Sequence, residues 1–126
     1  MRRLIYLKNG RVENVVNNKF INKEIYNPKL DRNGYAPSIL QSEEECWVSH
    51  AKNGLVRHEV FPASNRDKSK YFGLWVYLTP YWHNMSNEGV HFNKELDLKL
   101  RKYAQAEFEI HFPELDFVEI FGKNYL

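Results

Sequence analysis

Two apolar runs with a polar segment between them most constrain what this chain can form. The runs, LVRHEVF at 55–61 and GLWVYLT at 73–79, are rich in β-branched and aromatic residues and have the length of strands. They predict a β-hairpin, and the polar, basic segment PASNRDKSKYF between them predicts a long surface loop. Thr79 followed by Pro80 has the residue types of a helix N-cap and first helical position, so a short helix is expected to start there.

The segments on either side predict further elements. Residues 1–16 read as two short strands turned at Asn9-Gly10, a strong hairpin signal, and residues 17–37, rich in Asn, Lys, Gly and Pro, read as a linker or arm. Apolar residues at helical spacing predict a long amphipathic helix from Asn93 to about residue 110. A second, short helix is expected between Pro113 and Gly122. The fold class expected from these elements is α+β.

Composition limits the class of protein without naming a function. The chain has 126 residues, of which 43% are hydrophobic, enough for one modest core. It has no run of transmembrane length and no secretory leader, so we expect a cytoplasmic protein with no membrane partner. The single cysteine, Cys46, excludes an intramolecular disulfide, and the net charge of +2 permits nucleic-acid binding without indicating it.

Three of the five histidines lie between residues 55 and 93. His58 stands between two valines in the first expected strand, which by itself is more typical of a core residue than of a catalyst. His83 falls in the first turn of the short helix and His91 in the loop before the long one, where each is a candidate metal ligand. The alternatives are a turn residue packed against Trp82 for His83, and a polar residue near the next helix cap for His91.

The order of these residues resembles the HNH, or ββα-metal, nuclease motif: His58 in the first strand, Asn65 in the loop, His83 at the helix start. The segments RHEVF, SNR, GLWVYL, WHN, GVHFNKELDLKLRKYAQ and IFGKNYL are similar to a family of small phage and prophage proteins of Gram-positive bacteria that is regarded as HNH-type nucleases. The resemblance covers residues 38–126 and implies a ββα-metal core there. Residues 1–37 would then be a hairpin and linker extension.

The resemblance also implies roles for individual residues. His58 would be the general base that accepts a proton from the attacking water, and Asn65 would brace the loop that orients it. His83 and His91 would hold one divalent cation, Mg²⁺, Mn²⁺ or Zn²⁺, that polarises the scissile phosphate.

Basic residues of the predicted loop are the expected DNA contacts. Arg66, Lys68 and Lys70 alternate along it and could meet successive phosphates, although such a run is as often a solvated loop. Arg57 stands where the family's fuller pattern has a second histidine. Since an arginine does not bind a cation, either Arg57 contacts the scissile phosphate or the metal has lost a ligand.

The sequence also departs from the family's pattern at the positions of a structural zinc site, as it does at Arg57. Members of the family often carry a zinc knuckle whose positions correspond here to Cys46, Ser49, Thr79 and Trp82. Because only the cysteine is a zinc ligand, we expect no structural zinc and apolar packing of Trp82 in its place.

Two functions from different classes follow. The first is a metal-dependent DNA endonuclease of HNH type, acting in phage DNA recombination or processing in the bacterial host cytoplasm, with DNA and a recombination protein as partners. The second is a catalytically inactive HNH-like protein that binds DNA or assists recombination. Retention of His58, Asn65 and His83 favours the first function, and Arg57 favours the second.

Overall fold

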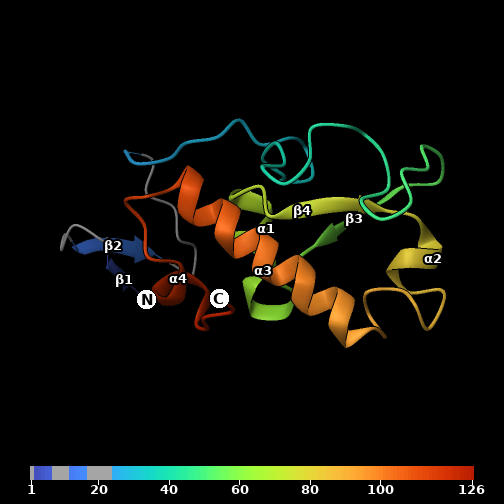
Figure 1. Cartoon of the computed structure of the whole chain (residues 1–126). Helices are drawn as coiled ribbons and strands as arrows, with labels where there is room; N and C mark the ends of the chain where they lie inside the picture. Colours follow the sequence, from blue (N-terminus) through green and yellow to red (C-terminus); the bar gives the residue numbers. More distant parts are fainter. Residues whose placement is uncertain (1, 7–11, 17–23) are drawn as a thin grey trace.

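The computed structural model describes residues 2–6, 12–16 and 24–126, and it has the expected α+β class. Two separate two-stranded antiparallel sheets lie at different places along one long helix (Figure 1). The first sheet pairs β1 (Arg2–Tyr6) with β2 (Val12–Val16), and the second pairs β3 (Val56–Glu59) with β4 (Trp75–Leu78). The long helix is α3 (Lys94–His111).

The N-terminal hairpin is confirmed as two strands, with Tyr6 opposite Val12. Its predicted turn at Asn9-Gly10 and residues 17–23 of the predicted linker lie outside the described residues. β1 lies beside the C-terminal helix α4 (Phe117–Phe121), at the opposite end of the molecule from α2 (Pro80–His83) (Figure 1).

The register of the β3–β4 hairpin sets two faces with different environments. His58 pairs with Val76, and Arg57 pairs with Tyr77. Since directly opposed residues of an antiparallel pair point to the same side, His58 shares the face of the fully buried Val76, which packs in the same core as Leu100 of α3. Arg57 and its partner Tyr77 therefore belong to the other face of the hairpin.

The prediction of a long surface loop between β3 and β4 is wrong. Residues 63–71 form a 3₁₀ turn (η1, Ala63–Asn65) and a helix (α1, Arg66–Tyr71). A pair of buried hydrogen bonds attaches this helix to the residue after the end of β3: the Ser69 hydroxyl accepts from the Phe61 N–H at 3.1 Å and donates to the Phe61 carbonyl at 2.8 Å. The segment is too short to show helical periodicity, and its serine gave no apolar signal.

The helices after β4 follow the sequence signals. α2 begins at Pro80 after Thr79, and α3 begins after Asn93, whose side chain accepts from the Leu96 N–H at 3.2 Å. α4 is capped by Asp116 and ends at Gly122. Within the described ranges, no helix is long and apolar enough to cross a membrane.

One core joins these elements. The inner side of α3 packs against the hairpin and against a cluster of phenylalanine rings, which come from α3, from α4 and from the residues just after β3 and α1. Residues 24–37, which come before the β3–β4 hairpin in the sequence, also lie against this core. Tyr26 stacks on Phe72 with ring centroids 5.8 Å apart, and the Ala36 carbonyl accepts from the Trp75 indole at 2.8 Å.

Gly73 gives a test of this packing. It has φ +71°, and a Cβ there would lie 2.2 Å from the Pro37 carbonyl oxygen. Gly73→Ala should therefore combine about 1–2 kcal/mol of left-handed strain with about 1–3 kcal/mol of overpacking. Gly54→Ala, at φ +68° with nothing within 4 Å, should incur the strain alone. Denaturant titrations of both variants check this, and equal losses would contradict the close approach of residue 37.

Candidate metal centre

Three histidines from three separate segments meet in one cluster. His58 comes from β3, His83 from the end of α2, and His91 from the loop before α3. One ring nitrogen of each lies within 4.8 Å of the other two. The ring centroids are 5.3 Å (His58–His83), 5.5 Å (His58–His91) and 4.5 Å (His83–His91) apart. The structure thus brings together the three histidines selected from the sequence.

Backbone hydrogen bonds hold the loop histidine in place. The Val90 N–H donates to the Trp82 carbonyl at 2.7 Å, and the His91 N–H donates to the His83 carbonyl at 3.1 Å. Gly89 allows this approach, because a Cβ there would lie 2.8 Å from the His83 carbonyl oxygen. His91 is therefore positioned through His83, although ten residues of irregular chain separate α2 from α3.

The cluster is closed on one side and open on the other. His58 is only 5% exposed, His83 is half-buried and His91 is exposed. Burial lowers the pKa of His58 to about 3, with help from the positive charges of His83, His91 and Arg101. His58 is therefore neutral near pH 7. Its Nε2 is buried without a hydrogen-bond partner, which is unfavourable unless something binds it.

The donor atoms fit a small cation. His83 Nε2 and His91 Nε2 are 2.9 Å apart and share a hydrogen bond, so one ring donates and the other accepts. Two imidazole nitrogens on one tetrahedral zinc ion, with Zn–N bonds of about 2.0–2.1 Å, lie about 3.3 Å apart. For the three rings to bind a zinc ion, the nitrogens of His83 and His91 would have to move slightly apart, and the His58 ring would have to move closer to them.

Asn65 and Arg57 lie elsewhere. The Asn65 amide donates to the Phe121 carbonyl at 3.0 Å and its oxygen accepts from the Lys68 ammonium, so Asn65 joins α1 to α4. Arg57, on the hairpin face opposite His58, pairs with Asp31 at 2.7 Å and stacks on the ring of Tyr35 at 4.4 Å. The expected bracing of His58 by Asn65 is not among the contacts that the structure shows.

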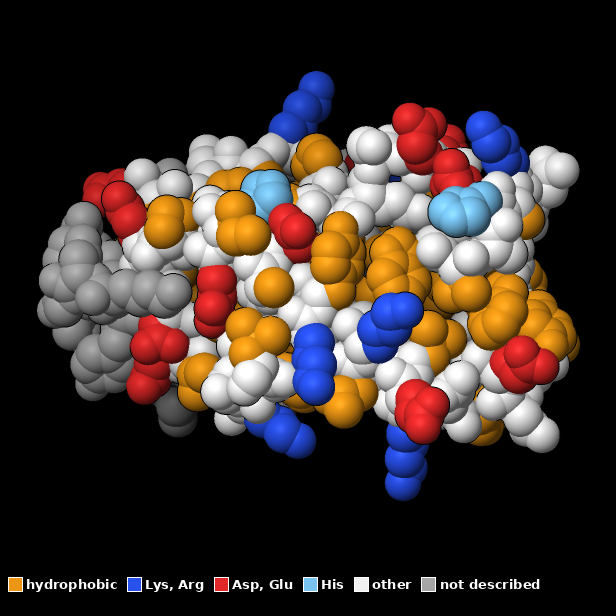
Figure 2. All heavy atoms as spheres, viewed as in Figure 1, with side chains coloured by type: hydrophobic (Ala, Val, Ile, Leu, Met, Phe, Trp, Pro, Cys, Tyr) orange, Lys and Arg blue, Asp and Glu red, His pale blue; other side chains and the backbone are white. Residues whose placement is uncertain are grey.

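The basic residues of α1 do not form the expected exposed row. Lys68 is 8% exposed and its ammonium donates to the Ile120 carbonyl at 2.8 Å, so an exposed phosphate contact is wrong for this residue. Arg66 is exposed and pairs with Glu59 at 2.6 Å, and Lys70 lies over the Tyr35 ring at 4.7 Å. On the face shown in Figure 2, Lys and Arg side chains stand singly among acidic and apolar ones.

Of the four positions that correspond to the expected zinc knuckle, Cys46 and Thr79 lie in contact. The Cys46 carbonyl accepts from the His50 N–H at 2.9 Å, and Cys46 Sγ lies 3.9 Å from Thr79 Oγ1. Trp82 is half-buried and packs against the core that contains Cys46. Over residues 24–126, the three histidines are the only group of metal-binding side chains with the required proximity.

Arg101 is a partly buried residue of α3 that the sequence did not single out. Only 24% of its side chain is exposed. Its Nη1 donates to the Tyr125 hydroxyl at 3.0 Å, and its positive charge contributes to the low pKa of His58. The available signal was its spacing: Asp97, Arg101 and Gln105 follow one helix line, and Gln105 is buried.

The buried, neutral His58 predicts an acid-sensitive metal-free protein. Its folded pKa of about 3 lies below the unfolded value near 6.5, so the unfolded chain binds more protons between these limits. The free energy of unfolding should fall by up to about 2 kcal/mol from pH 6.5 to pH 5. Urea titrations with chelator measure this. His58→Leu should flatten the dependence, whereas His111→Ala, which removes an exposed histidine, should retain it; equal slopes in all three proteins would contradict the assignment.

Comparisons of the chain with protein-family models, curated proteins and solved structures find no match. The geometry of the three histidines, their burial and their hydrogen bonding are therefore the basis for inferring a function. These properties describe a nitrogen-donor site with one open side, carried by a strand, a helix end and a loop.

Proposed function

We propose that this chain is a metal-dependent DNA endonuclease of HNH type, with β3, β4 and α2 as its ββα-metal core. The observation that carries the proposal is the convergence of His58 and His83, from a strand–strand–helix unit, with His91 from the following loop; their ring nitrogens lie within 4.8 Å of one another. A bound divalent cation supplies polarisation of the scissile phosphate and stabilisation of the leaving oxygen. The sequence resemblance adds DNA as substrate and phage recombination or processing as the setting.

The donor set favours some cations over others. All three candidate ligands are imidazoles, and no carboxylate belongs to the cluster. Imidazole nitrogen suits Zn²⁺, Ni²⁺ and Co²⁺, whereas Mg²⁺ prefers oxygen ligands and gives up its water reluctantly. Of the ions expected from the sequence, Zn²⁺ fits this site better than Mg²⁺.

The proposal changes the role of His58. A neutral imidazole has one nitrogen lone pair, so the same ring does not both hold a cation and accept the proton of the attacking water. His58 Nε2 is buried without a hydrogen-bond partner, and the ring touches the other two histidines rather than open solvent. We therefore assign His58 as the third ligand and not as the general base.

Each neighbouring group has a distinct task in this arrangement. The backbone bonds between residues 82–83 and 90–91 keep His83 and His91 facing each other, and the hairpin register fixes His58 from the opposite side. Arg57 and Arg66 pair with Asp31 and Glu59 on the other face of the hairpin.

The ligand assignment is tested by titrating Zn²⁺ or Co²⁺ into single alanine variants of the three histidines. Each variant should lose more affinity than the roughly 10–100-fold that follows loss of an outer partner, because a direct ligand is removed. The measurements are calorimetry for zinc and visible absorption for cobalt. His111→Ala, an exposed histidine at the end of α3, is the control and should bind metal as the parent chain does.

Cleavage of supercoiled DNA in the same variants separates ligand from base. If His58 is a ligand, His58→Ala loses metal affinity and cleavage together; if it is the base, the variant binds metal normally and fails only to cut. Parent protein that binds the cation and DNA yet cuts in none of Zn²⁺, Co²⁺, Ni²⁺, Mn²⁺ and Mg²⁺ would refute the nuclease and leave the inactive binding protein.

A further inference from the structure

The outer face of the β3–β4 hairpin, which is the face opposite His58, lies against residues 29–37. Arg57 holds the two together: its guanidinium pairs with Asp31 at 2.7 Å and lies over the rings of Tyr35 at 4.4 Å and Trp75 at 4.9 Å. The segment and the hairpin therefore form one continuous surface on the other side of the hairpin from the histidine centre.

A cavity of about 270 Å³ lies between this segment and the hairpin. Its lining combines aliphatic side chains, two aromatic rings and a guanidinium: Leu30, Ala36, Pro37, Tyr35, Trp75 and Arg57. Nucleobases stack on aromatic rings and on guanidinium planes with little regard to sequence, and a guanidinium also donates hydrogen bonds to base edges. The lining therefore suits a flat, largely apolar ring with polar atoms at its edge.

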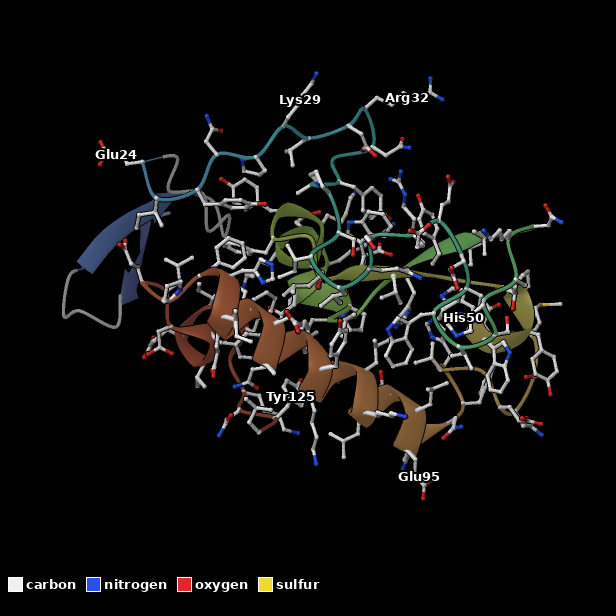
Figure 3. All side chains as sticks on the ribbon, turned by 45° about the horizontal axis from the view of Figure 1, so that its top comes forward. Glu24, Lys29, Arg32, His50, Glu95 and Tyr125 are labelled. Atoms are coloured by element: carbon white, nitrogen blue, oxygen red, sulfur yellow. The ribbon has the colours of Figure 1, made fainter. Side chains whose placement is uncertain are left out.

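Positively charged side chains lie at and beside this cavity. Lys29 belongs to its lining, Arg32 follows in the same segment, and Lys70 Nζ lies 4.7 Å from the centre of the Tyr35 ring. Figure 3 shows Lys29 and Arg32 projecting outward on the same side of the molecule. Among the described residues, none of these three cations has a carboxylate partner, and Asp31 of the lining is already in an ion pair. The charge around the cavity is thus complementary to an anionic polymer.

We propose that this surface binds single-stranded nucleic acid, with one unstacked base in the cavity and the flanking phosphates on Lys29, Arg32 and Lys70. A base of a duplex would first have to be unpaired and unstacked at a cost in free energy, so a single strand is the expected form. The inference goes beyond the proposed function, because the surface lies opposite the histidine centre and requires no metal.

The first measurement compares two fluorescent strands of about ten nucleotides, an oligothymidylate and an abasic oligomer with the same number of phosphates. Titrations are made with chelator, so that the histidine centre holds no cation. The parent chain should bind the oligothymidylate at least about 5-fold more tightly, because only that strand supplies a base to the cavity. Equal affinity for the two strands, or equally tight binding of polyglutamate, would overturn the inference and leave a surface for any polyanion.

The phosphate contacts are tested by salt dependence. The double variant Lys29→Ala, Arg32→Ala removes two of them, so the slope of log affinity against log salt concentration should become shallower by about 1.4. Lys99→Ala with Lys102→Ala removes the same charge from exposed positions of α3 and should keep the slope of the parent chain. Equal slopes in the two double variants would contradict the placement of the strand.

The cavity is tested by one side chain of its wall. Leu30 is 41% exposed, so Leu30→Gln should leave the fold intact while it weakens the preference for the oligothymidylate over the abasic strand. Leu98→Gln makes the same change on α3 at a side chain that is 44% exposed, and it should keep the full preference. If the two glutamine variants behave alike, the base does not occupy this cavity.

The outcomes also distinguish this inference from the proposed function. Parent protein that binds the single strand through Lys29 and Arg32 but cuts no DNA with any of the cations supports the inference and refutes the nuclease. Parent protein that cuts DNA, with the Lys29 and Arg32 double variant binding the single strand as the Lys99 and Lys102 variant does, supports the nuclease and overturns the inference.

Discussion

The pairing of His58 with Val76 is the constraint on which the rest of the site depends. It places an imidazole on the core face of a short hairpin, where burial keeps the ring neutral and leaves its Nε2 without a partner. A shift of the register by one residue would exchange the faces and bring Arg57 inward. The register is held from outside the hairpin as well, since the Ser69 hydroxyl bonds both backbone groups of Phe61 and the Gln41 amide oxygen accepts from the Tyr77 N–H at 2.9 Å.

The two faces divide the charged residues into separate tasks. On the outer face, Arg57 pairs with Asp31 and packs over the rings of Tyr35 and Trp75, so it secures segment 31–36 against the hairpin. Arg66 pairs with Glu59 and so joins α1 to β3. The Arg101 guanidinium of α3 likewise lies between the Asp97 carboxylate and the Tyr125 hydroxyl. Both arrangements therefore use positive charge to hold separate segments together.

Much of this could be predicted from residue patterns that act locally. Both hairpins, the start of α2 after Thr79, the Asn93 cap and the length of α3 follow from turn residues, capping residues and periodicity. The three histidines could be selected because their order matched a known arrangement. What depends on contacts between distant segments could not: the Ser69 bonds that attach α1 to the residue after the end of β3, the burial of Lys68 under Ile120, and the partial burial of Arg101.

The same burial that makes His58 a good ligand also makes it unfavourable to the metal-free fold. A neutral imidazole with a buried, unsatisfied nitrogen raises the free energy of the folded state, and a cation bound by that nitrogen removes the penalty. Arg101 acts on the balance from its side, because its charge disfavours protonation of His58 and so keeps the lone pair available.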